Sequence, residues 1–131
     1  MNTARNTLGR TACAVLLGTL LGVAPIAHAV PGSGGNAVPV PADYDYDPSR
    51  GALHDYCTVA GNDTPGVDFR GACARHDQCM QREGKAGYDA CHTAFGIDLA
   101  SECTWSFPPG PARDTCHLAA HSMETAVRVV N

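Results

Sequence analysis

Cysteine is the residue type that most constrains how this chain can fold. Six of the seven cysteines lie between residues 57 and 116, and the seventh, Cys13, stands apart near the N-terminus. Six cysteines in a small chain indicate a disulfide framework if the chain is secreted, because a core of this size gains much of its stability from cross-links. We therefore predict three disulfides, and the count alone leaves their pairing open.

The first 29 residues follow the pattern of a secretory signal peptide. Two arginines precede an apolar run that ends in the small-x-small sequence Ala27-His28-Ala29, which is typical of a cleavage site. A membrane anchor is the alternative, but the run is short and is interrupted by a proline. Cleavage after Ala29 would remove Cys13 and leave 102 residues with a net charge of −6, since two arginines and no acidic residue are lost. The sequence thus predicts secretion, and this negative charge argues against a nucleic-acid partner.

The mature chain divides by composition into a lead-in and a domain. Residues 30–48 are rich in proline, glycine and aspartate and poor in large apolar groups, which predicts a flexible N-terminal segment. Tyr44 and Tyr46 could dock on the domain, but we favour the flexible interpretation. Residues 49–131 contain the six clustered cysteines and are expected to form the folded domain.

We expect this domain to be all-α. Apolar residues repeat every three or four positions, as on one face of a helix, and no stretch alternates as a strand does. Helices are predicted at about 69–83, with Asp68 as the N-cap, at about 88–104, and from near Pro111 onward. The turn sequence GKAG makes the first two helices an antiparallel hairpin, to which the C-terminal helix is added.

The hairpin predicts which side chains meet. Cys79 and Cys91 lie nearly level on either side of the turn, so we pair them. His76 falls on the inward face of the first helix, and Asp98 lies within about one helical turn of its level. Asp89 misses that level by about 9 Å and faces the opposite side of its helix. Asp98 is therefore the expected partner of His76.

The sequence CARHDQC, residues 73–79, places a histidine and an aspartate side by side between two cysteines. A zinc site made of Cys73, His76 and Cys79 is one interpretation. It is disfavoured because three ligands on consecutive turns of one helix cannot easily surround an ion, and exported cysteines pair with each other. The other histidines are interpreted as solvent-facing, including the two on the last helix that could otherwise hold a metal: His54, His92, His117 and His121.

A catalytic interpretation uses the same residues better. A histidine held by a carboxylate is an oriented general base, because the acid fixes the ring tautomer and stabilises the imidazolium. Asp77 points about 100° away from His76 around the helix, where it suits a hard cation such as calcium. A base beside a metal favours hydrolysis by an activated water, and the sequence contains no G-x-S-x-G motif of a serine nucleophile.

The same stretch resembles a known family. CARHDQC has the form C-x-x-H-D-x-C of the active-site helix in secreted, calcium-dependent phospholipases A2, and FRGACARHD resembles the prokaryotic and fungal branch in particular. Cys57 precedes Cys73 by 16 residues, as the calcium-loop cysteine does in that family. The resemblance covers residues 49–103. It implies a Ca²⁺-dependent enzyme, expected to be monomeric, that hydrolyses the sn-2 ester of glycerophospholipids at a membrane or micelle surface.

The resemblance also implies roles for individual residues. His76 would be the base that deprotonates water, and Asp98 would be the carboxylate behind it. The calcium ligands would be Asp77, Asp55 and the backbone carbonyl of Tyr56.

The disulfide pairing rests on three different arguments. The resemblance implies Cys57–Cys73, and the hairpin geometry indicates Cys79–Cys91. The two cysteines that remain then form the third pair, Cys103–Cys116.

Two features depart from the family pattern. The tyrosine expected four residues after the histidine is Met80, which removes a hydroxyl that would support Asp98, and Tyr88 could replace it. The spacing from His76 to Asp98 is also one residue longer than expected. The alternative function is a non-catalytic, secreted binding or toxin-like module on the same scaffold. Its mark would be a broken His-Asp pair, and the pair here is intact.

Overall fold

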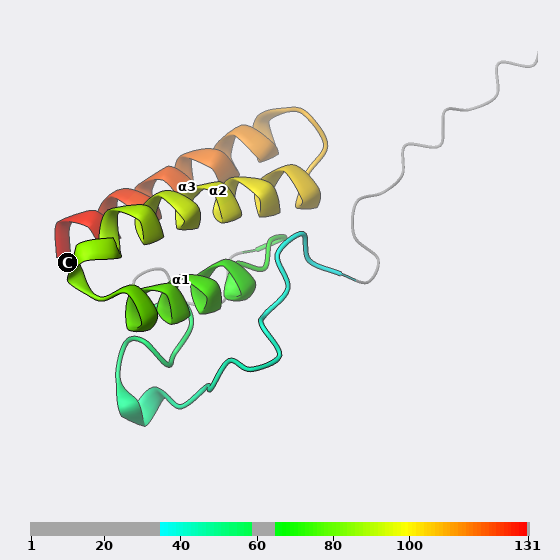
Figure 1. The fold of residues 1–131 in the computed structure, drawn as a ribbon. Coiled ribbons are helices and arrows are strands. Elements are labelled where there is room, and N and C mark those ends of the chain that lie inside the picture. The colour runs from blue at the N-terminus through cyan, green and yellow to red at the C-terminus, as the bar shows by residue number, and fades with distance from the viewer. Residues whose placement is uncertain (1–34, 59–64, 131) are drawn as a thin grey trace, which may run out of the picture.

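Three α-helices make up most of the computed structural model, which describes residues 35–58 and 65–130 (Figure 1). The predicted signal peptide at 1–29 and the start of the lead-in, residues 30–34, lie outside the described residues. The elements are η1 (Pro48–Arg50), α1 (Arg70–Glu83), η2 (Lys85–Gly87), α2 (Tyr88–Ser106) and α3 (Pro111–Val130). The described ranges contain no strand, and none of their helices has the length and hydropathy needed to cross a bilayer. The small all-α fold is therefore confirmed.

The helix ends lie close to their predicted positions. α1 begins at Arg70, and its N-cap is Phe69 rather than Asp68. Asp68 nevertheless satisfies one of the free amides at this end, because its Oδ1 accepts a hydrogen bond from the backbone N–H of Arg70 at 3.0 Å. α1 stops at Gly84, whose φ of 61° suits a residue without a side chain. α2 continues to Ser106, two residues beyond the predicted end.

The helices pack in chain order, α1 against α2 and α2 against α3 (Figure 1). Their shared core is apolar: Phe69, Ala72, Phe95, Leu99, Met123 and Val127 are among its buried members. Three disulfides join the elements, and they are the predicted pairs: Cys57–Cys73, Cys79–Cys91 and Cys103–Cys116. The first ties the loop before α1 to that helix, the second ties α1 to α2, and the third ties α2 to α3.

Residues 35–48, which belong to the lead-in that the sequence predicts to be flexible, contact α1 and α2 at specific points. The buried carboxylate of Glu102 on α2 accepts hydrogen bonds from the backbone N–H groups of Val38 at 2.6 Å and Ala37 at 3.3 Å. Val38 is itself buried. Its carbonyl passes so close to α1 that a Cβ on Gly71 would lie 1.7 Å from the carbonyl oxygen. Composition could not reveal this docking, because the groups that hold the segment lie on distant helices.

Candidate active site

His76 is buried on α1 and makes a hydrogen bond to a second histidine. Its Nε2 lies 3.0 Å from Nδ1 of His92, which is buried on α2. The face of the His76 ring stacks on Phe95, with 4.6 Å between ring centroids. The prediction that His92 faces solvent is therefore wrong. His92 is the site residue that sequence reasoning missed, and its position directly after Cys91 was the available signal.

The structure does not bring Asp98 to His76, which corrects the expected pair. Oδ2 of Asp98 lies 3.4 Å from Nε of Arg75, an exposed side chain on the neighbouring position of α1. Asp98 is only half-buried, because the inward stripe of α2 passes through His92, Phe95 and Leu99. A shift of one position around the helix turns a side chain by about 100°, which is enough to move this carboxylate out of the His76 environment.

Burial makes the two histidines neutral. It lowers the pKa of His76 to about 4, and the charge of His92 contributes in the same direction. Burial also lowers the pKa of His92, and Arg128 adds to this effect, whereas Asp89 and Glu124 oppose it. At neutral pH each ring therefore carries a proton on one nitrogen and leaves the other nitrogen free to accept one, which is the state that a general base requires.

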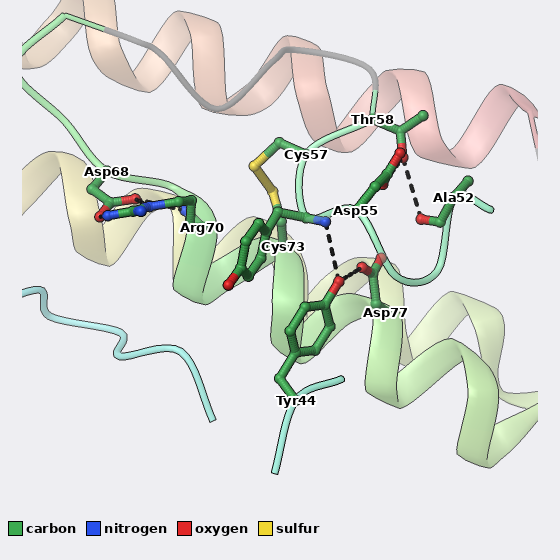
Figure 2. The surroundings of a disulfide bond; sticks show 10 residues. Tyr44, Ala52, Asp55, Cys57, Thr58, Asp68, Arg70, Cys73 and Asp77 are labelled. Carbon is green, nitrogen blue, oxygen red and sulfur yellow. Dashed lines mark hydrogen bonds and ion pairs between the residues drawn. A yellow bond between two sulfur atoms is a disulfide. The ribbon is translucent and has the colours of Figure 1, made fainter. Parts of the chain in front are cut away.

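Asp77 is buried on α1 next to His76 and contacts the N-terminal segment. The Tyr44 hydroxyl donates a hydrogen bond of 2.5 Å to Oδ2 of Asp77 and accepts one of 3.1 Å from the backbone N–H of Tyr56. Figure 2 shows the Tyr44 and Asp77 side chains pointing toward each other, one from the segment and one from α1. Burial raises the pKa of Asp77 to about 7, the Tyr44 bond opposes this shift, and the charge of Asp55 adds to it.

Three tyrosines form a stack beside Asp77. The ring centroids of Tyr44 and Tyr56 are 4.9 Å apart, and those of Tyr46 and Tyr56 are 4.6 Å apart. Tyr56 has a φ of 62°, an uncommon conformation for a non-glycine residue, and its N–H is the donor to Tyr44. The alternation DYDYD at 43–47 was the only sequence signal that these tyrosines share one face.

The predicted calcium ligands provide oxygen donors that suit calcium. Asp55 is half-buried and close enough to Asp77 for its charge to raise that carboxyl's pKa, and a divalent cation would relieve this repulsion. The Tyr56 carbonyl accepts a hydrogen bond of 3.2 Å from the Thr58 N–H, and a carbonyl oxygen keeps a second lone pair. Carboxylate and carbonyl oxygens are the ligands that calcium prefers, so these residues fit the ion.

The zinc interpretation is excluded by the disulfides. Cys73 and Cys79 are each bonded to another cysteine, so neither offers the thiolate that zinc requires. Within residues 35–58 and 65–130, no group of three or more His, Cys, Asp or Glu side chains could hold a metal ion. This includes the neighbourhood of His117 and His121 on α3.

A cavity of about 160 Å³ connects these features. His76 and Asp77 both line it, together with Tyr56 and Thr58 from the loop that precedes α1. The rest of its wall is largely apolar and comes from that loop, α2 and α3: Ala52, Leu53, Phe95, Met123, Val127 and Val130. The base and the carboxylate therefore meet at an apolar hollow.

Comparisons with protein-family models, curated proteins and solved structures found no match to this chain. A neutral histidine, a buried carboxylate and an apolar cavity together suit the hydrolysis of an ester that carries an apolar chain.

Proposed function

We propose that the protein is a secreted, calcium-dependent phospholipase A2 that cleaves the sn-2 ester of glycerophospholipids. The observation that carries this proposal is that His76 and Asp77, consecutive residues of the motif, both line one apolar cavity. The motif predicts that one of these residues is a base and the other a metal ligand. Because both line the same cavity, a substrate bound there could contact both. The apolar wall suits an acyl chain, and the substrate surface would be a membrane or micelle.

In the proposed reaction His76 acts as the general base. With Nε2 held by His92, Nδ1 is the nitrogen that takes a proton from water, and the resulting hydroxide adds to the sn-2 carbonyl carbon. The ester C–O bond then breaks, and His76 returns the proton to the leaving oxygen of the lysophospholipid. Calcium held by Asp77, Asp55 and the Tyr56 carbonyl would supply positive charge for the substrate phosphate and the developing oxyanion.

Secretion belongs to this proposal as well. Three disulfides are typical of proteins that fold in an oxidising compartment, and the N-terminal sequence has the signal-peptide pattern. We also propose that α1 and α2 form the catalytic hairpin of this fold, and that the protein acts as a monomer.

One observation favours a second function. The group behind His76 is an imidazole where the resemblance implies a carboxylate, and a neutral ring stabilises an imidazolium less than a carboxylate does. A secreted, non-catalytic binding module that kept the disulfide scaffold is therefore the alternative.

Fatty-acid release from phosphatidylcholine vesicles and mixed micelles, labelled in the sn-2 chain, separates the two functions. We expect release in calcium and none in EDTA, and we expect His76→Asn to abolish it. The matched control is His121→Asn, which makes the same change at an exposed histidine of α3 and should retain activity. No release by the wild-type protein from either substrate, with calcium present, would favour the binding module.

A further inference from the structure

The ring of His76 has one hydrogen-bond partner among the residues that the structure describes, Nδ1 of His92 at 3.0 Å. We propose that His92 is a positioning residue: its Nδ1 accepts a hydrogen bond from Nε2–H of His76 and thereby fixes the tautomer in which Nδ1 of His76 can accept a proton. This inference rests on the proposed hydrolase function. It replaces the expected carboxylate with a neutral ring.

Two neutral imidazoles joined nitrogen to nitrogen allow only two arrangements of their protons. If His76 donates, its Nδ1 is unprotonated and can serve as a base. If His92 donates, the proton of His76 must lie on Nδ1, and the ring cannot take a proton from water there. In the proposed role, His92 must therefore accept the hydrogen bond from His76 and must not donate one to it.

Packing holds the two rings in this relation. Both are buried, with exposed fractions of 8 % for His76 and 3 % for His92, and Phe95 stacks on the ring of His76. The Cys79–Cys91 disulfide crosses from α1 to α2 one helical turn after His76 and one residue before His92. The hydrogen bond consequently lies beside a covalent link that keeps the two helices in register.

Among residues 35–58 and 65–130, no carboxylate takes this place. Asp98 is engaged by Arg75, and Tyr88 meets the His92 ring edge-on, with 6.1 Å between centroids. His92 therefore orients His76 without supplying a counter-charge. An asparagine at position 92 would keep this function, because its Oδ1 is the same number of bonds from Cα as the Nδ1 of histidine. A leucine would fill similar space without any acceptor.

The kinetic test compares His92→Leu with His92→Asn in the calcium-dependent release assay. We expect His92→Leu to lower kcat by about 10- to 10⁴-fold with KM changed less than about threefold, as for loss of base orientation. His92→Asn should stay within about tenfold of wild-type kcat. The matched controls are His121→Leu and His121→Asn, at an exposed histidine. A His92→Leu protein that keeps wild-type kcat would overturn the inference, as would a His92→Asn protein that melts like the wild type but is as slow as His92→Leu.

A spectroscopic test on the wild-type protein does not depend on turnover. In ¹⁵N-labelled, disulfide-intact protein we expect a scalar coupling across the N–H···N hydrogen bond between the two rings. The proton should lie on Nε2 of His76, and Nδ1 of His76 should have the chemical shift of an unprotonated nitrogen. A proton on Nδ1 of His76 would overturn the inference even if lipid is hydrolysed. The expected spectrum in a protein that releases no fatty acid would leave the pairing intact and refute the proposed function alone.

Discussion

Replacing Asp77 with asparagine should stabilise the calcium-free protein. The Asp77 carboxyl is 3 % exposed, and its pKa is raised from the ordinary 3.8 to about 7, first by burial. A difference of about 3 between these pKa values corresponds to about 4 kcal/mol, at about 1.4 kcal/mol for each pKa unit. Because the folded-state pKa is the higher one, the favourable contribution of the neutral carboxyl is complete below pH 4 and is lost as the pH rises through 7. Asparagine is neutral throughout and can still accept the Tyr44 hydrogen bond.

The pH dependence gives this prediction a second signature. The pKa of His76 is lowered from 6.5 to about 4, so its contribution is present above pH 6.5 and is lost as the pH falls toward 4, by about 3 kcal/mol. In the wild-type protein the two groups act in opposite directions over this range. Asp77→Asn removes the contribution of this carboxyl, so the unfolding free energy should rise more from pH 4 to pH 7 in the variant than in the wild-type protein.

The assay is chemical denaturation followed by circular dichroism, in EDTA and with the disulfides intact, at pH 3, 4, 7 and 8. Asp77→Asn should exceed the wild-type unfolding free energy by up to about 4 kcal/mol at pH 8 and match it near pH 3. Calcium should then stabilise the wild-type protein and leave the variant unchanged. The control, Asp89→Asn, removes a charge whose side chain is fully exposed and should change stability by less than about 0.5 kcal/mol. A variant less stable than wild type at pH 8 in EDTA would refute the reasoning about burial, and equal stabilisation by calcium would refute Asp77 as a ligand.

Three further predictions concern the contacts around this site. Tyr44→Phe removes a hydroxyl whose hydrogen bond holds the pKa of Asp77 down, so calorimetry should show that calcium binding requires a higher pH than in the wild type. Glu102→Ala leaves the backbone N–H groups of residues 37 and 38 without their acceptor; it should lower the unfolding free energy by about 1–3 kcal/mol for the buried N–H of Val38, and faster amide exchange at Val38 would locate the effect. Asp98→Asn should lower kcat far less than His92→Leu, because Asp98 pairs with an arginine; equal losses in the release assay would return the catalytic role to Asp98.

Local pattern was enough to find the helices and the cysteine framework. Apolar spacing indicates where the helices lie, and glycines such as Gly84 mark where they end. Both signals lie within a few residues of the helix or helix end that they predict. The pairing Cys79–Cys91 followed because the two cysteines lie at nearly equal distances along the chain from the same turn. The motif CARHDQC likewise placed His76 and Asp77 next to each other on one helix, about 100° apart around its axis, without any knowledge of distant contacts.

The partner of His76 depended on register, which the turn alone did not settle. If the turn centre is placed between residues 85 and 86, the position on α2 level with His76 can be counted along the chain. His92 and Asp98 each lie three residues from that position, or about 4.5 Å along the helix axis. If Cys79 and Cys91 are taken as level because they are bonded, His92 lies two residues from the position level with His76, and Asp98 lies four residues from it. These offsets are about 3 Å and 6 Å along the helix axis. The covalent link therefore favours His92.

Taken alone, the sequence determined the all-α class, the three helices, the six clustered cysteines and the positions of the motif residues, because each depends on neighbours in the chain or on composition. Only the tertiary structure decided that His92 stands behind His76, that Tyr44 reaches Asp77, and that residues 35–48 dock on α1 and α2. These contacts join residues 16 to 64 positions apart. Their geometry depends on how whole helices pack, since a rotation of α2 by one residue, about 100°, changes which of its side chains face α1.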